Sequence, residues 1–281
     1  MYKNIQGSTR LSGIIGWPID HSFSPTIHNY WISLHSINGA YVPFAVNPEN
    51  FKQAIKSISS LGILGVNITV PFKELALYEM DELDSAAKEI GAVNTVIVKK
   101  NGCLFGKNTD GEGFISSLRY NEPSWKPSER PIVVLGAGGA ARSIIFALKS
   151  AGAKEIRIVN RTIEKAEKLA TSFGNTCVVF DWKNNKEILR DVGLFVNATS
   201  LGMKEKPYFD FSIDNLPKDA LVNDIVYNPI ETDLLRNAKK RGNKIVNGLD
   251  MLIYQAAPAF YEWFGIMPKA DNKLRNILIA K

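Results

Sequence analysis

The sequence has few of the residues that build disulfides and metal sites. Only two cysteines and three histidines occur among its 281 residues. Cys103 and Cys177 are far apart and form no C-x-x-C pair, which argues against a disulfide framework and against a zinc site. His21, His28 and His35 are evenly spaced, but no other ligand type accompanies them. We therefore predict no metal site.

Long hydrophobic runs are also missing. Every apolar stretch is interrupted by Gly, Asn or a charged residue before it reaches the about 18 residues of a membrane span. The opening stretch MYKNIQGSTRLSGIIGW lacks the continuous apolar segment and the small-residue cleavage site of a signal peptide. We expect a cytoplasmic protein that has no membrane partner.

Basic residues are in excess, giving a net charge of +6, but they are scattered. The only short clusters are Lys99-Lys100 and Lys239-Lys240-Arg241, and no aromatic residues are interleaved with them. This distribution does not predict a nucleic-acid partner, and attraction of small anionic ligands is enough to explain the surplus. We expect a monomer or homodimer that acts on a small-molecule substrate.

Short β-branched runs alternate with amphipathic helical segments along nearly the whole chain, which is typical of α/β proteins with largely parallel sheets. The proline-rich segment NEPSWKPSERP (121–131) marks a domain boundary. Within the first part, we expect a strand at 65–70 and a helix at 24–35 with Ser24 as its N-cap and Pro25 in its first turn. A hairpin at 95–107 should turn at Asn101-Gly102, the preferred pair of a type I′ turn.

A glycine-rich turn follows the boundary. Gly136, Gly138 and Ala141 match the pattern G-x-G-x-x-[GA] between an apolar strand and a helix. The first glycine permits a tight turn, and the second lets backbone N–H groups approach a pyrophosphate at the helix N-terminus. The next strand and helix strengthen the prediction of a dinucleotide site.

The residues at the end of the second strand of this domain predict which nicotinamide cofactor the protein binds. NAD sites usually carry an acidic residue there. Glu155 begins the strand and therefore lies at its wrong end, whereas Asn160 and Arg161 follow its last residues and Lys165 lies one helical turn further. A basic pair without a carboxylate favours NADP.

Four stretches of the first part place polar side chains just beyond expected strand ends, where open α/β sheets bind ligands. Ser22 has no expected capping role and, with Ser24, can form a carboxylate site at a helix N-terminus. Thr69 and Lys73 follow a strand, and Asn94 precedes the hairpin. Thr109 and Glu112 are expected to form a capping box, which leaves Asp110, flanked by Gly111 and Gly113, without a structural role.

This set of groups suits the reduction of a ketone on a small polyhydroxy acid. A proton must reach the new alkoxide, and no histidine, tyrosine or zinc stands in a dehydrogenase-like motif. Lys73 is therefore the predicted proton donor, with Asp110 orienting its ammonium group. Gln255, in an otherwise apolar helix at 250–265, is a buried amide that needs a partner. That helix is expected to pack back toward the first domain.

The chain resembles the shikimate dehydrogenase family in nine motifs that occur in the family's order. They are PIDHSFSP, NITVPFK, IGAVNT, GKNTDGEG, GAGGAAR, NRT, NATSLGM, DIVYNP and NGLDMLIYQ, and they span Pro18 to Gln255. The resemblance implies reversible, NADPH-dependent reduction of 3-dehydroshikimate to shikimate, a step toward chorismate and the aromatic amino acids. It also implies an α/β fold of two domains. These are a substrate-binding and catalytic domain at 1–112 plus 249–281, with an open, mostly parallel sheet, and a Rossmann-type NADP-binding domain at 113–248.

The resemblance further implies roles for single residues. Lys73 and Asp110 would be the catalytic pair. The carboxylate of the substrate would be held by Ser22, Ser24 and Tyr227, and its ring hydroxyls by Thr69, Asn94, Asp110 and Gln255. The cofactor would contact Gly136, Ala137, Gly138, Gly139, Ala140, Asn160, Arg161, Thr162, Lys165, Thr199, Ile225, Gly248 and Met251. At Lys165 an arginine is common in the family, so one bidentate phosphate contact is replaced by a point charge.

Three alternatives stay open beside this interpretation. A quinate/shikimate dehydrogenase with relaxed cofactor use is disfavoured by Asn160-Arg161, because an NAD-using enzyme would carry an acid there. A methylenetetrahydrofolate dehydrogenase would not need the paired serines. A non-catalytic NADP-binding regulatory protein should have lost Lys73 or Asp110, and both are present.

Overall fold

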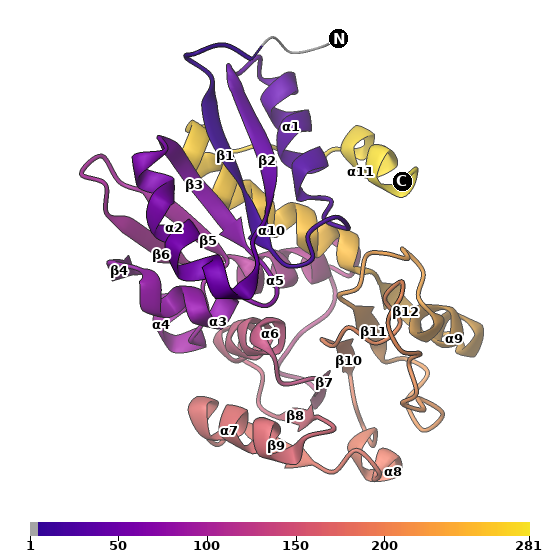
Figure 1. Cartoon of the computed structure of the whole chain (residues 1–281). Helices are drawn as coiled ribbons and strands as arrows, with labels where there is room; N and C mark the ends of the chain where they lie inside the picture. The colour runs from indigo at the N-terminus through magenta and orange to yellow at the C-terminus, as the bar shows by residue number, and fades with distance from the viewer. Residues whose placement is uncertain (1–4) are drawn as a thin grey trace. The chain divides into compact units, whose positions relative to one another are not determined.

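The chain divides into two compact α/β units, shown in a computed structural model that describes residues 5–281 (Figure 1). The first unit contains the chain up to Thr109 together with Gln255–Lys281, and the second contains Asp110–Tyr254. The domain boundaries after residues 112 and 248 stay a prediction. The proline-rich segment 121–131, expected to mark a boundary, lies inside the second unit, because α5 (Asp110–Asn121) already belongs to that unit. The assignment of one domain to the substrate and the other to the cofactor stays a prediction.

The sheet of the first unit has six strands in the order β2-β1-β3-β5-β6-β4. β1 pairs in parallel with β2 and β3, whereas β5 is antiparallel to β3 and β6, and β4 is parallel to β6. The strands are β1 Arg10–Gly16, β2 Gly39–Ala45, β3 Ile63–Ile68, β4 Glu82–Leu83, β5 Thr95–Val98 and β6 Leu104–Lys107. The helices are α1 Ser24–Leu34, α2 Phe51–Ser60, α3 Lys73–Ala76, α4 Ser85–Ile90 and α11 Asn272–Ile279, with short 3₁₀ turns at Pro48–Asn50 and Leu77–Glu79.

The core beside β3 follows from the spacing of apolar residues in α2. Phe51, Ile55 and Ile58 recur at helical intervals, and all three are buried. The ring of Phe51 stacks on Phe72 with centroids 4.4 Å apart. Each such side chain contributes about 1.5–3 kcal/mol on burial. Phe72 is therefore an apolar anchor directly before Lys73.

The last long helix, α10 (Gly248–Phe264), packs its C-terminal half into the first unit, as predicted for the apolar segment 250–265. The indole N–H of Trp263 donates to the carbonyl of Val96, and Phe260 and Trp263 pack around the ring of His28. Burial lowers the pKa of His28 to about 3, so this imidazole is neutral and part of the core.

The turn of the β5–β6 hairpin is not the predicted type I′. That turn needs a positive φ at both central residues. Among the described residues other than glycine, only Ser36, Asp191 and Glu205 have a positive φ, so Asn101 does not fit. Lys99 and Cys103 instead close the loop with a hydrogen bond of 2.9 Å, and Gly102 alone has φ +87°. One extra loop residue changed the turn, while the hairpin itself is confirmed.

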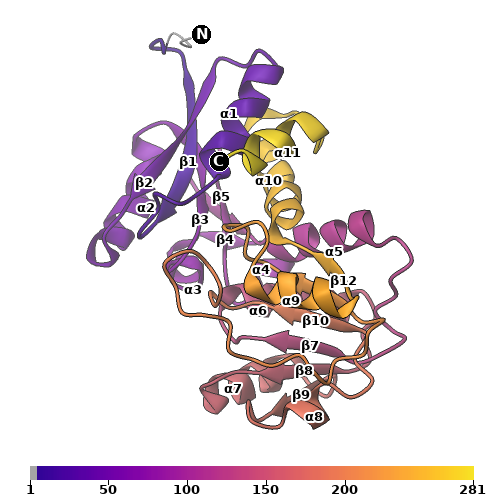
Figure 2. The same cartoon turned by 90° about the vertical axis from the view of Figure 1, so that its right-hand side faces the viewer.

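The sheet of the second unit is parallel throughout and has the order β12-β11-β10-β7-β8-β9. Figure 2 shows β10, β7, β8 and β9 one above another. The strands are β7 Ile132–Leu135, β8 Ile156–Val159, β9 Cys177–Phe180, β10 Leu194–Asn197, β11 Leu221–Asp224 and β12 Lys244–Val246. The helices are α5 Asp110–Asn121, α6 Gly139–Ser150, α7 Ile163–Phe173, α8 Asn185–Ile188, α9 Asp233–Arg241 and the start of α10. The strands β7, β8 and β9 follow one another toward one edge of the sheet, and β10, β11 and β12 follow one another toward the other edge. This is the strand order of dinucleotide-binding folds.

The order of this sheet also fixes where a ligand can bind. β7 and β10 are neighbours although β8 and β9 separate them in the chain, so the direction of winding reverses between them. Ligands of open α/β sheets bind beyond the carboxyl ends of the strands at such a point. The glycine turn after β7 and Thr199 after β10 both lie there.

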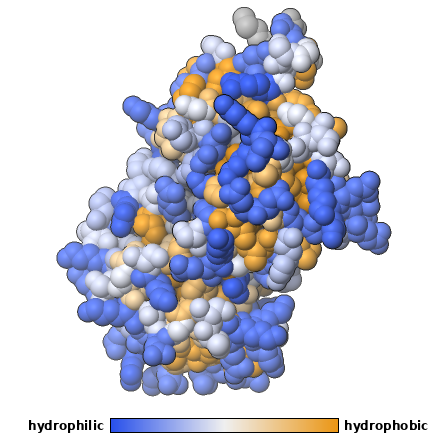
Figure 3. Space-filling model, turned by 90° about the vertical axis from the view of Figure 1, so that its left-hand side faces the viewer, coloured by the Kyte–Doolittle hydropathy of each residue, from blue (hydrophilic) through white to orange (hydrophobic). Residues whose placement is uncertain are grey.

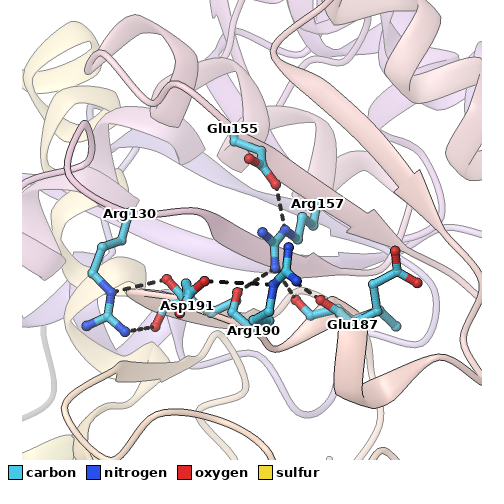
Figure 4. A network of polar contacts seen from close by, with 8 residues as sticks. Arg130, Glu155, Arg157, Glu187, Arg190 and Asp191 are labelled. Carbon is cyan, nitrogen blue, oxygen red and sulfur yellow. Dashed lines mark hydrogen bonds and ion pairs between the residues drawn. The ribbon is translucent and has the colours of Figure 1, made fainter.

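Glu155 and Arg157 belong to a network at the other end of β8, shown in Figure 4. Arg157 is buried and bonds through Nε to Glu155 at 2.7 Å and through Nη1 to the carbonyls of Ile188 and Arg190 at 2.8 and 2.7 Å. Arg130 reaches the carbonyls of Asp191 and Val192 from another side. Glu155 therefore has a structural partner, which agrees with its exclusion as a cofactor ligand.

Hydrophilic residues cover most of the face drawn in Figure 3, with hydrophobic residues showing between them. Over residues 5–281, no helix combines the length and the hydrophobicity that crossing a bilayer requires.

Candidate active site

The paired serines lie at the start of α1, and neither is its N-cap. The helix begins with Ser24 itself, so the prediction of Ser24 as N-cap is wrong, and Phe23 takes that position. The hydroxyl of Ser22, expected to have no capping role, accepts the N–H of Ser24 at 3.3 Å. The Ser24 side chain is buried beside the hydroxyl of Tyr41, whose pKa is raised by burial against a smaller lowering effect of Ser24. Long-range packing has thus turned Ser24 inward.

Lys73 is positioned from both sides by the core. β3 ends at Ile68 instead of the predicted Val70, so Thr69 lies just beyond the strand, where its N–H donates to the carbonyl of Ile15 at 3.0 Å. Phe72 is fully buried, and Lys73 is the first residue of α3. The carbonyl of Lys73 accepts the N–H of Val93 at 2.8 Å. The backbone of this lysine is therefore held between the ends of two segments, with its side chain half-buried.

Asn94 and Gln255 meet in the interior of the first unit. The amide of Asn94 donates to Gln255 Oε1 at 3.2 Å and to Thr109 Oγ1 at 2.9 Å. Thr109 in turn donates through Oγ1 to the carbonyl of Gln255, also at 2.9 Å. The buried amide of Gln255 thus has the partner that its place in an apolar helix required.

These bonds replace the expected capping box. In the described residues, the Thr109 hydroxyl bonds to Asn94 and Gln255 and not to the N–H of Glu112, so that prediction is wrong. The glycine at position 111 also has a structural explanation. A Cβ there would lie 2.8 Å from the carbonyl of Ser143, so its place in α5 depends on close packing against α6. Asp110 is the buried first residue of α5.

Sequence reasoning missed three buried polar residues that support Asn94. Tyr41 donates through its hydroxyl to Asn67 at 2.7 Å, and Asn67 donates to Thr95 Oγ1 and to the carbonyl of Asn94. Thr95 closes the network by donating to Asn94 Oδ1 at 3.0 Å. The available signal was Asn67 itself, because an amide within the buried stretch GVNITV requires hydrogen-bond partners.

The glycine turn after β7 has the shape that a dinucleotide needs. Gly136 has φ +116°, and a Cβ there would lie 3.0 Å from the carbonyl of Ala198. Gly138 faces open space, since a Cβ would meet no atom within 4 Å. α6 then begins at Gly139 and runs for 12 residues, so its first N–H groups and positive dipole end are directed at this space. Ala137 and Ala140 complete a turn without bulky or acidic side chains, which fits a pyrophosphate.

The basic group predicted for the ribose lies directly after β8. Asn160 donates to the carbonyl of Thr162 at 2.7 Å, and Thr162 caps α7 by position without a side-chain bond. Arg161 forms an ion pair with Asp210 at 2.7 Å, a partner that the sequence did not suggest. Lys165 lies in the first turn of α7, four residues after Arg161 in the chain.

Thr199 and Ile225 are placed by a buried polar network at the ends of β10 and β11. Asn197 Oδ1 accepts both the N–H and the hydroxyl of Thr199, at 3.1 and 2.7 Å, and the carbonyl of Asn197 accepts the N–H of Ile225. Asn197 donates to Asp224 at 3.0 Å, and Asp224 also accepts from Thr232. Tyr227 follows this network in the chain, after the end of β11.

Gly248 and Met251 begin α10, and both have structural surroundings. Gly248 leaves no room for a side chain, because a Cβ would lie 2.0 Å from the carbonyl oxygen of Ile225. Met251 packs in the apolar core of the second unit, with Ile225 at its margin. Within residues 5–281, no group of His, Cys, Asp and Glu side chains is arranged to hold a metal ion.

Known proteins of one family match this chain along most of its length. A model of the shikimate dehydrogenase substrate-binding domain matches residues 14–96, one of shikimate/quinate 5-dehydrogenase matches 122–205, and one of the shikimate 5′-dehydrogenase C-terminal domain matches 248–272. A shikimate dehydrogenase (NADP(+)) of Paramagnetospirillum magneticum is 45% identical over 98% of this chain and 100% of its own length. This chain belongs to the shikimate dehydrogenase family.

Two further relatives support the assignment. The shikimate dehydrogenase (NADP(+)) of Rhodospirillum rubrum is 44% identical over 99% of both chains. The crystal structure of shikimate dehydrogenase from Aquifex aeolicus superposes with a TM-score of 0.90 at 40% identity, covering 99% of this chain and 100% of that one. The predicted family and fold class are confirmed. The roles of single residues stay predictions, among them the pairing of Lys73, in the first unit, with Asp110, in the second.

Asp224 gives the stability of this family member a specific pH dependence. Burial raises the pKa of Asp224 from 3.8 to about 6, against the lowering effect of its bonds with Thr232, Val226 and Asn197. Between these values the folded protein binds more protons than the unfolded chain, so the free energy of unfolding falls as pH rises. Relative to Asp224→Asn, which does not titrate, the wild type should lose about 2–3 kcal/mol between pH 4 and pH 7. Urea denaturation of both proteins across this pH range measures the free energy of unfolding of the wild type minus that of the variant. A value that stays constant or rises with pH would contradict the prediction.

Proposed function

We propose that this protein catalyses the reversible reduction of 3-dehydroshikimate by NADPH to shikimate and NADP⁺, with uptake of one proton, a step toward chorismate and the aromatic amino acids. The observation that carries the proposal is the full-length similarity to relatives named as NADP-dependent shikimate dehydrogenases. The residues that directly follow β8, Asn160 and Arg161, include no carboxylate, which supports NADP as the cofactor.

The substrate would be held by two groups of polar side chains. Ser22 and Ser24, at the N-terminus of α1, bind the substrate carboxylate together with Tyr227. Thr69, Asn94, Asp110 and Gln255 bind the ring hydroxyls. Asn94 and Gln255 are already fixed by their mutual hydrogen bond, so little side-chain freedom is lost when they take up a hydroxyl.

The catalytic pair of the proposal is Lys73 and Asp110. In the direction of reduction, the Lys73 ammonium group gives a proton to the oxygen of the ketone as that oxygen gains negative charge. In the direction of oxidation, the Lys73 amine takes the proton of the hydroxyl. Asp110 orients the ammonium group and accepts a hydrogen bond from a neighbouring hydroxyl.

The cofactor would lie along the carboxyl ends of the second sheet, and when bound it supplies the hydride. Backbone N–H groups of Gly136, Ala137, Gly138, Gly139 and Ala140 hold the pyrophosphate. Arg161 and Lys165 bind the ribose 2′-phosphate, beside Asn160 and Thr162. Thr199, Ile225, Gly248 and Met251 complete the cofactor contacts. The cytoplasmic location and the monomeric or homodimeric state stay predictions.

The proposal is tested by measuring oxidation of shikimate and of quinate with NADP⁺ and with NAD⁺, followed by nicotinamide absorbance. Shikimate with NADP⁺ should give the highest kcat/KM of the four combinations. A preference for quinate or NAD⁺ would favour the broader dehydrogenase class. Binding of NADPH without turnover of either acid would instead indicate a regulatory protein.

A further inference from the structure

Arg161 makes two contacts, one with a carboxylate and one with an aromatic ring. Its guanidinium group bonds to the carboxylate of Asp210 at 2.7 Å and lies over the ring of Trp182, 5.4 Å from the centroid. Trp182 follows β9, whereas Asp210 lies in the connection between β10 and β11. A third segment, the residues after β8, contributes the arginine.

The backbone on both sides of Asp210 is anchored, although the Asp210 side chain is itself exposed. Its two chain neighbours, Phe209 and Phe211, both contact the buried ring of Phe195 in β10, with centroids 6.4 and 5.7 Å away. The ring of Trp182 meets Phe211 edge to face at 5.1 Å. Packing therefore fixes the ring of Trp182 and the segment of backbone that carries Asp210.

The position of this pair is informative because it lies at the end of β8. In NAD-binding sheets a carboxylate at this strand end accepts the ribose 2′-hydroxyl, whereas a basic residue accommodates the 2′-phosphate of NADP. This chain has the basic residue after β8 and a carboxylate delivered to the same point from another loop. Glu155 does not serve this purpose, since it pairs with Arg157 at the opposite end of the strand.

We propose that Asp210 is a specificity-determining residue that lowers the preference of this protein for NADP over NAD. The inference rests on the proposed function, in which Arg161 binds the 2′-phosphate. Asp210 occupies one N–H of the guanidinium group and places a negative charge beside the phosphate position. A bound 2′-phosphate must share Arg161 with this carboxylate, whereas the uncharged 2′-hydroxyl of NAD meets no repulsion.

The expected size of the effect follows from exposure and charge. The side chains of Arg161 and Asp210 are 53% and 54% exposed, so water and salt screen the interaction strongly. A doubly charged phosphate a few ångströms from a carboxylate then loses about three- to tenfold in affinity. NAD⁺ should be affected by less than about twofold on the same grounds.

The test compares Asp210→Asn with Asp214→Asn. Both substitutions remove one negative charge from the same loop. Asp214 is 85% exposed and its nearest cation, Arg241, is 3.9 Å away, so it controls for the change in net charge. Affinities for NADP⁺ and NAD⁺ are measured by calorimetry at fixed ionic strength. Asp210→Asn should tighten NADP⁺ binding about three- to tenfold and leave NAD⁺ nearly unchanged, while Asp214→Asn should change neither.

Arg161→Ala separates failure of this inference from failure of the cofactor assignment. It should weaken NADP⁺ binding, and Asp210→Asn should still tighten NADP⁺ binding in the double variant, because repulsion between the carboxylate and the phosphate does not depend on Arg161. If Arg161→Ala weakens NADP⁺ binding but Asp210→Asn behaves like Asp214→Asn, or weakens NADP⁺ binding, only the inference about Asp210 is overturned. If Arg161→Ala leaves NADP⁺ binding intact, the phosphate assignment and the inference both fail.

Discussion

Replacing Lys73 with alanine is expected to lower kcat for shikimate oxidation with NADP⁺ by about 10²- to 10⁴-fold. The substitution removes the only predicted group that can take the hydroxyl proton during oxidation. It should leave the affinity for NADP⁺ unchanged, because the residues proposed to bind the cofactor belong to the second unit. Steady-state kinetics and an NADP⁺ titration of the same preparation measure the two quantities.

Two control variants make this prediction specific to proton transfer. Lys88→Ala removes an equal charge from the exposed side of α4 and should retain full activity. Lys73→Arg keeps the charge but replaces a compact ammonium with a planar group that does not release its proton, so it should remain inactive. Turnover of Lys73→Ala within about tenfold of the wild type would exclude Lys73 as the proton donor.

Replacing Gly248 with alanine is expected to lower the free energy of unfolding by about 3 kcal/mol, the upper end of the usual cost of overpacking. The new Cβ would lie 2.0 Å from the carbonyl oxygen of Ile225 and 2.4 Å from its carbon. Both are backbone atoms at the end of a central strand, so neither can move without disturbing β11 and the start of α10. Urea denaturation measures the loss.

Gly138→Ala is the matched comparison for Gly248→Ala. A Cβ at Gly138 meets no atom within 4 Å, and its φ of −93° is ordinary for alanine, so stability should change by less than about 1 kcal/mol. The added methyl group would instead occupy space beside the first N–H groups of α6, where the pyrophosphate is proposed to bind. We expect weaker NADP⁺ binding without unfolding. Equal losses of stability in the two variants would contradict the prediction that Gly138 has room for a methyl group.

The predictions that succeeded rest on patterns repeated over many residues. Alternation of apolar strands and amphipathic helices identified two α/β units, and the glycine turn with its flanking strand and helix located the start of the second sheet. Such patterns are reliable because a helix or strand can bury all of its apolar residues together only when one particular face is turned to the core. The strands β4, β9 and β12 and the helices α4, α8, α9 and α11 were not predicted. Most of them are short, and neighbouring strands or the core stabilise them more than their own residues do.

The errors in the candidate site have a common physical origin. Ser24, Thr109 and Asn101 were each assigned to a local hydrogen-bond motif. In the structure, Ser24 is buried beside Tyr41, and Thr109 bonds to Asn94 and Gln255, residues distant in the sequence. The hairpin turn gained a residue relative to the expected one. Short polar side chains have several possible partners of similar energy, so tertiary contacts decide among them.

The order of residues by itself determined the fold class, the family, the dinucleotide turn and the identity of Lys73, Asp110 and Arg161 as candidate groups. Only the tertiary structure decided that Asn67, Thr95 and Tyr41 support Asn94, that Gly248 is required by the backbone of Ile225, and that Asp210 meets Arg161. The reason is that periodic burial is written into each segment, whereas a hydrogen bond or an ion pair between distant segments exists only after the sheets have brought them together.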